Sequence, residues 1–155
     1  LIPLMANYWK SDNQHNFRKS LTRTILMITL IGSIAVAVSV TAGKHALILL
    51  YGNIIGSHTA LLHPAVVTAS LIALVYYLNA ILIIIRDMKG LIASNLIGCT
   101  AGILVSHFFI PKFGAAGANY SLLLAMFLLS LMLLLRISLM IHKRKAMEKF
   151  NVLPE

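Results

Sequence analysis

Acidic residues are scarce in this sequence. Of its 155 residues only four are aspartate or glutamate, against thirteen lysine or arginine, and the formal net charge is +9. Charged residues of both signs make up 11% of the chain, whereas hydrophobic residues make up 59%. Because soluble domains typically carry about 25% charged residues, this composition cannot cover a soluble fold with polar surface. The sequence therefore indicates an integral membrane protein.

Cysteine is almost absent too. Cys99 is the single cysteine and lies inside an apolar run, so the sequence excludes an internal disulfide and a cysteine-rich metal site. The glycines match neither a phosphate-binding loop nor a dinucleotide fingerprint, and no carboxylate lies near His58 or His63. We therefore expect no enzymatic activity and no cofactor.

The amino-terminal stretch lacks the features of a signal peptide. Residues 1–17 have no basic start, no apolar middle and no small-residue cleavage site, and the first residue is not methionine. The opening residues LIPLM look like the close of an earlier apolar segment. We expect the natural polypeptide to extend upstream of residue 1.

Long apolar runs fill the rest of the sequence. About 20 apolar residues in a helix are enough to cross a hydrocarbon core of about 30 Å. The runs therefore predict an all-α fold, a polytopic membrane helix bundle with four spans at 24–42, 64–85, 91–110 and 116–141. The remaining segments are predicted to be a connector at 1–23 and a basic tail at 142–155.

Turn-forming residues set the predicted ends of these spans. Gly43 ends the first span, and Pro64 is typical of the first turn of the second. Residues 45–57 are apolar but too short to cross, and two glycines interrupt them, so we expect an interfacial or packed loop there. Charged residues at 86–90 end the second span.

Basic residues between the spans predict the orientation. The first connector and the tail hold four lysine or arginine residues each and the 86–90 turn holds two, whereas 43–62 and 111–115 hold one each. Lysine and arginine accumulate on the cytoplasmic side of membrane proteins. We therefore expect both termini and the 86–90 turn in the cytoplasm. Since topology accounts for these cations, no nucleic-acid partner is expected.

Small residues recur at every fourth position of the third predicted span. Ser94, Gly98, Gly102 and Ser106 align on one face of a helix. Such a face lets two membrane helices approach closely. Packing within the chain is the expected role, and a sliding or dimerisation surface is the alternative.

Polar side chains within the spans are the candidates for function, because each needs a partner or a hydrated cavity. For Asn79 and Asn95, in neighbouring spans, we expect an interhelical hydrogen bond, with a place in a substrate cavity as the alternative. Arg136 lies five residues before the end of the last span, so it can snorkel toward the headgroups or line a cavity for an anion. With Arg86, these residues form the candidate substrate cavity.

Three strings carry a family resemblance. LILLYGNII follows the first span, IIIRDMKG closes the second, and IPKFGAAGA at 110–118 joins the last two. Their order resembles the carboxy-terminal part of polysaccharide biosynthesis flippases, the Wzx-type lipid-linked oligosaccharide transporters of the MOP superfamily. The resemblance implies that the chain is part of one lobe of a two-lobe transporter.

The implied activity is translocation of undecaprenyl-diphosphate-linked oligosaccharide across the bacterial inner membrane, for O-antigen, capsule or exopolysaccharide synthesis. The implied partners are this lipid-linked oligosaccharide, membrane lipids and the remaining helices of the transporter. An anionic cargo suits the sequence, because no Asp or Glu lies within any predicted span. Two alternatives stay open: part of a MATE-type multidrug exporter, or a small four-helix membrane assembly partner without transport activity.

Overall fold

The computed structural model describes residues 2–11, 14–52 and 59–151. Over these residues the chain is all-α, with helices α1 (Ile2–Lys10), α2 (Gln14–Tyr51), α3 (Thr59–Ile85), α4 (Met88–Phe113) and α5 (Ala115–Asn151). Four segments of this described part are long and apolar enough to cross a membrane: His15–Leu49, Leu61–Ile85, Met88–Phe113 and Ala115–Lys143. The expected polytopic bundle is confirmed, and the chain is a multi-pass membrane protein.

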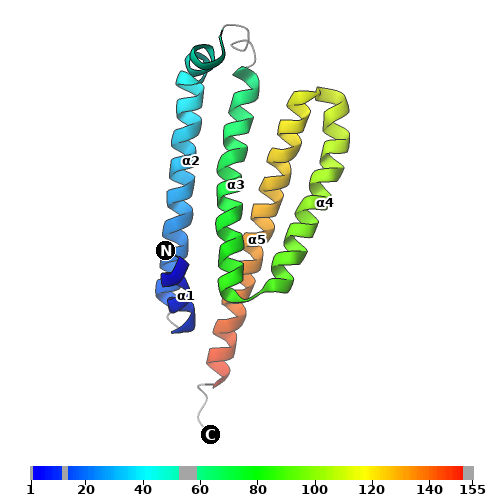
Figure 1. Cartoon of the computed structure of the whole chain (residues 1–155). Helices are drawn as coiled ribbons and strands as arrows, with labels where there is room; N and C mark the ends of the chain where they lie inside the picture. The colour runs from blue at the N-terminus through cyan, green and yellow to red at the C-terminus, as the bar shows by residue number, and fades with distance from the viewer. Residues whose placement is uncertain (1, 12–13, 53–58, 152–155) are drawn as a thin grey trace.

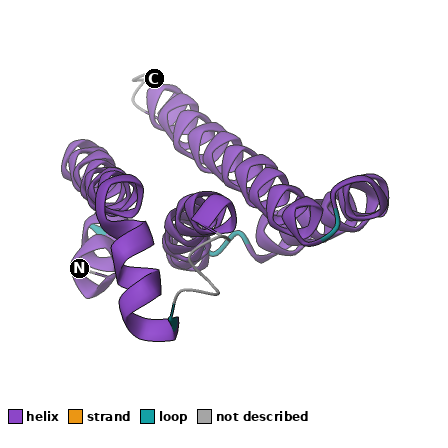
Figure 2. Cartoon of the chain, turned by 90° about the horizontal axis from the view of Figure 1, so that it is seen from above, coloured by secondary structure: helices purple, strands orange, loops and turns teal. Residues whose placement is uncertain are grey.

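Helix α3 occupies the centre of the bundle. Helix α2 lies on one side of it, and the α4–α5 hairpin lies on the other (Figures 1 and 2). Helix α1, the α3–α4 turn and the carboxy-terminal part of α5 share one end of the molecule, which we call the basal end (Figure 1). The predicted topology likewise puts both termini and the 86–90 turn on one side. Which side faces the cytoplasm stays a prediction.

Helix α2 is longer than predicted. It continues through Gly43 to Tyr51, and its last part turns across the end of the bundle opposite the basal end (Figures 1 and 2). The loop expected at 45–57 is therefore wrong for 45–51, and residues 53–57 lie outside the described part. Gly43 is a helix contact: a Cβ there would lie 2.6 Å from Cδ2 of Leu62 on α3.

The connector expected at 1–23 is also largely helical, since it contains α1 and the first turns of α2. The reason is burial, because Met5 and Phe17 are almost fully enclosed. Helix α3 starts at Thr59, before Pro64, and α5 extends to Asn151 through most of the predicted tail. Helix ends are thus set by packing as well as by local turn residues.

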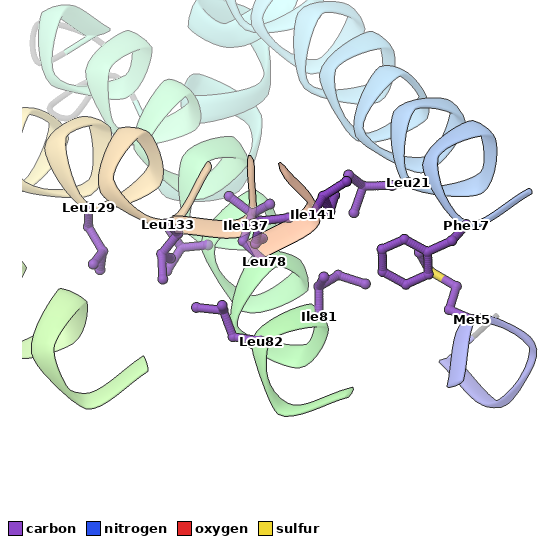
Figure 3. Packing of buried hydrophobic residues seen from close by; sticks show 11 residues of the cluster. Met5, Phe17, Leu21, Leu78, Ile81, Leu82, Leu129, Leu133, Ile137 and Ile141 are labelled. Atoms are coloured by element: carbon purple, nitrogen blue, oxygen red, sulfur yellow. The ribbon is translucent and has the colours of Figure 1, made fainter. Parts of the chain in front are cut away.

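The hydrophobic core lies toward the basal end of the bundle (Figure 3). Four helices contribute to it: Met5, Phe17, Leu21, Val75, Leu78, Ile81, Leu82, Leu129, Leu133, Ile137 and Ile141. Leu78 and Leu82 are one turn apart on α3, as are Leu133 and Ile137 on α5, so each helix presents a continuous apolar stripe. Lipid is as apolar as these side chains, so close packing stabilises the core within the membrane.

Hydroxyl side chains on the exposed faces bond to their own helices. Thr29 Oγ1 donates to the carbonyl of Ile25 at 2.9 Å, and Thr100 Oγ1 donates to that of Leu96 at 2.9 Å. A polar group facing lipid needs an internal partner because the bilayer core holds no water. These exposed threonines are therefore compatible with a lipid-facing surface.

Candidate functional site

The α3–α4 turn consists of Arg86 and Asp87. The N–H of Arg86 donates to the carbonyl of Ile83 at 3.0 Å, and the N–H of Asp87 donates to that of Leu82 at 3.1 Å. This pair of bonds is a Schellman motif, with Arg86 at the left-handed position and a φ of 63°. A non-glycine residue there costs about 1–2 kcal/mol. The turn thus keeps an exposed cation where glycine would be less strained.

Asp87 both caps α4 and binds α5. Its Oδ1 accepts a hydrogen bond from the backbone N–H of Gly90 at 3.1 Å, and its Oδ2 accepts one from Nε of Arg136 at 2.7 Å. The Asp87 side chain is 6% exposed and that of Arg136 is 39% exposed. One carboxylate therefore joins the turn to a residue 49 positions away in the sequence.

The neighbouring cations keep Asp87 ionised. The hydrogen bond from Arg136 lowers the pKa of Asp87 below its ordinary value of 3.8; burial raises it, and the Gly90 N–H and the charges of Arg136 and Lys143 lower it. Asp87 therefore carries a negative charge at neutral pH.

Gly90 makes this junction possible. A Cβ at this position would overlap both the carboxylate of Asp87 and Nε of Arg136. Any other side chain would therefore have to displace the ion pair. We call Arg86, Asp87, Gly90 and Arg136 the basal junction.

The sequence identified Arg86 and Arg136 but not the other two members of the basal junction. Arg136 does not stand alone, since it pairs with Asp87; snorkelling toward the headgroups stays a prediction. The missed signal is an aspartate three residues before a glycine at the start of a helix. Aspartate is a common N-cap residue, and the glycine has no side chain that would crowd the capping carboxylate. That pattern predicts the cap on α4, whereas the pairing with Arg136 is a contact between distant residues that the structure reveals.

Asn79 and Asn95 meet between α3 and α4. Nδ2 of Asn95 donates to Oδ1 of Asn79 at 3.1 Å and to the carbonyl of Leu91 at 2.8 Å. The expected interhelical hydrogen bond is therefore present. Both side chains are half-buried, so they tie the two helices together without being sealed from their surroundings.

The small residues of α4 lie largely against α5. Ser94 and Gly98 are buried, and a Cβ at Gly98 would lie 2.9 Å from Cδ1 of Leu129. A Cβ at Gly102 would lie 3.2 Å from Cβ of Ala125. Ser106 is half-buried and donates to the carbonyl of Ile103 at 2.9 Å. The middle of this stripe therefore gives the α4–α5 hairpin its close helix contact.

Two glycines shape the end of the hairpin opposite the basal end. Gly114 ends α4 with a φ of 56°, a conformation that favours glycine. A Cβ at Gly117 would overlap the backbone carbonyl of Phe109, so only glycine lets the two backbones come this close. The geometry of the turn thus accounts for both glycines of the IPKFGAAGA string.

The basal junction carries a surplus of cations. Arg86 on the turn and Lys89 in the first turn of α4 are exposed, and Arg136 and Lys143 of α5 act electrostatically on Asp87. The turn and the helices beside it thus carry more cations than described carboxylates, a balance suited to a phosphate group at the membrane surface. Among the residues that the structure describes, no group of three His, Cys, Asp or Glu side chains could hold a metal ion.

Comparison with known proteins assigns no family. The chain matches no family model, no curated protein and no solved structure. The resemblance to Wzx-type flippases therefore depends on the sequence strings alone and is taken up below as a proposal.

Proposed function

We propose that this chain is a four-span part of a flippase that moves undecaprenyl-diphosphate-linked oligosaccharide across the bacterial inner membrane. The observation that carries the proposal is the sign of the charges in the spans, which contain no Asp or Glu. Asp87, between the second and third spans, is neutralised by Arg136. A pyrophosphate would meet no free carboxylate along these helices, whereas an exporter of cations normally needs one at membrane depth.

Arg86 is the first residue we assign to the pyrophosphate. It is exposed at the basal end, and its positive φ shows that the backbone holds an arginine where glycine would fit better. Strain of this kind is a reason to look for function at the strained residue. A guanidinium can donate two parallel hydrogen bonds to phosphate oxygens, which a glycine cannot replace.

Arg136 gives the proposal a mechanism. Its side chain is 39% exposed while it pairs with Asp87, so an entering phosphate can reach it and compete with the carboxylate. Loss of the Asp87 contact would loosen the α3–α4 turn from α5. The ion pair would then have two states, formed and broken. The protein would bind the substrate with different affinity in each state, as alternating access requires.

The proposal is tested with the protein as its gene encodes it. Deleting the gene should lower surface polysaccharide and leave lipid-linked oligosaccharide accumulating in the cytoplasmic leaflet. Expression of Arg86→Gln should restore export poorly. Lys112→Gln, which removes an exposed cation from the opposite end of the hairpin, should restore it fully.

Three results would count against the proposal. One is normal polysaccharide after deletion combined with sensitivity to cationic drugs, which would favour the MATE-type exporter. The second is full export by a variant in which uncharged residues replace Arg86 and Arg136 and leucine replaces Asn79, which would reject the proposed site. The third is normal export and drug tolerance with loss of a partner membrane protein, which would favour an assembly role.

A further inference from the structure

A second polar feature of the basal end lies between α2 and α5, away from the basal junction. These helices both pack against α3, and in the described part of the chain their own backbones do not come close to each other. Between them is an open groove with a volume of about 470 Å³. Small-molecule sites in proteins measure about 300–1,000 Å³, so the groove is large enough for part of a ligand.

The groove has polar residues set along an apolar wall, which consists of Leu21, Leu134, Ile137, Leu139 and Ile141. Arg18 and Thr22 line it from α2, and Ser138 and His142 line it from α5. Each pair is four residues apart and so lies on one face of its helix. Helix α2 leaves the basal end and α5 returns to it (Figure 1), so Arg18 and His142 lie nearer that end and the two hydroxyls lie one turn further in. Leu134 lies one further turn into the span.

Arg18 is an exposed cation at the mouth of the groove. It does not pair with Asp87, the one acidic residue whose side chain the structure describes. An arginine beside a membrane groove attracts phosphate through charge and through its planar pair of donors. Basic pockets between membrane helices are typical sites for anionic headgroups.

We infer that this groove binds one anionic phospholipid. The phosphate lies against Arg18 beside His142, the glycerol and ester oxygens reach the hydroxyls of Thr22 and Ser138, and an acyl chain follows the apolar wall at Leu134. The cation lies nearer the basal end than the two hydroxyls, as the phosphate precedes the ester groups in the lipid, and the apolar wall beside them suits an acyl chain. This site uses none of the residues assigned to transport, so its test does not depend on whether the proposed function is correct.

The inference is tested by lipid binding to the 155-residue chain in detergent. Native mass spectrometry with phosphatidylglycerol and phosphatidylcholine should show preferential retention of the anionic lipid. Arg18→Gln should weaken phosphatidylglycerol binding about fivefold, which corresponds to about 1 kcal/mol for one cation near the surface. Lys19→Gln is the matched control, because Lys19 is exposed next to Arg18 but does not line the groove.

A second variant separates a groove from a charged surface. Ser138→Phe fills the groove without changing any charge, and it should also displace phosphatidylglycerol. Equal retention of the two lipids would overturn the inference. So would equal losses in Arg18→Gln and Lys19→Gln, unchanged binding to Ser138→Phe, or displacement of the lipid by inorganic phosphate at low millimolar concentration, which would indicate a simple anion site.

Discussion

Substitution of Asp87 tests how the α3–α4 turn is held against α5. Asp87→Asn keeps an oxygen that can cap α4, since asparagine and aspartate are about equally good at this position, but it removes the charge that faces Arg136. Asp87→Ala removes both contacts. The alanine variant should therefore be less stable than the asparagine variant by about 1 kcal/mol, the usual value of a helix N-cap.

The free energy that the Asp87–Arg136 ion pair contributes to folding should lie between the values of exposed and of buried charged contacts. Fully exposed pairs contribute about 0.2–1 kcal/mol, whereas hydrogen bonds to charged groups contribute about 1.5–3 kcal/mol. Here the carboxylate is enclosed and the guanidinium is partly exposed. We expect a coupling of about 1–2 kcal/mol between Asp87→Asn and Arg136→Gln in a double-mutant cycle. Arg136→Gln alone should cost more than Asp87→Asn, because it leaves an enclosed carboxylate without a counter-ion.

The measurement is equilibrium unfolding in mixed micelles with increasing dodecyl sulfate, followed by circular dichroism. The folded pKa of Asp87 lies below its ordinary value of 3.8, so the stabilisation is complete above about pH 4 and is lost as the pH falls through the lowered pKa. Asp87→Asn should lack this part of the acid sensitivity. A coupling below about 0.3 kcal/mol, which is the scatter of additive pairs, would refute the structural role of the ion pair.

Four further predictions concern other contacts. Gly117→Ala should destabilise the fold by about 1–3 kcal/mol through overlap with the α4 backbone, although helix propensity alone favours alanine by about 1 kcal/mol; stabilisation in the same unfolding assay would show that the helices can separate there. Asn79→Leu and Asn95→Leu should each cost about 0.6 kcal/mol, and the double variant should cost no more than either single one, since they share one bond. Arg86→Gly should raise stability by up to about 1 kcal/mol by relieving the positive φ while lowering polysaccharide export; unimpaired export would show that its charge is not used. Reporter fusions at Ser57 and at Arg86 should report the periplasm and the cytoplasm respectively, and a cytoplasmic signal from the first would contradict the predicted orientation.

The predicted helix ends failed where local signals opposed tertiary contacts. Gly43 and the charged residue after it look like a helix stop, but the glycine allows α2 to lie against Leu62 and the helix continues. The polar sequence of the connector at 1–23 gives no sign of a helix, yet Met5 and Phe17 are buried and the segment is largely helical; its extramembrane position stays a prediction. Turn propensity acts over a few residues and is easily overcome by packing, so such boundaries are the least predictable part of the fold.

The candidate site was only partly predictable for a similar reason. Spacing placed Gly98 and Gly102 on one helix face, and the structure puts both against α5. The polarity of Asn79 and Asn95 in adjacent spans was enough to predict their hydrogen bond. Asp87 was missed as the partner of Arg136, because nothing in a single sequence relates residues that far apart.

Membrane residence, the helical fold and the absence of acidic residues from the spans were determined by the sequence by itself. The reason is that insertion into lipid depends on the total hydrophobicity of about 20 consecutive residues. Lipid also offers the backbone no hydrogen-bond partner, so the backbone must form its hydrogen bonds internally. Only the tertiary structure decided that Arg136 binds Asp87, that Gly90 and Gly117 are points of close approach, and that Arg18 and His142 line one groove. Periodicity specifies which residues share one face of a helix. Which neighbouring helix that face contacts depends on how all the helices pack together.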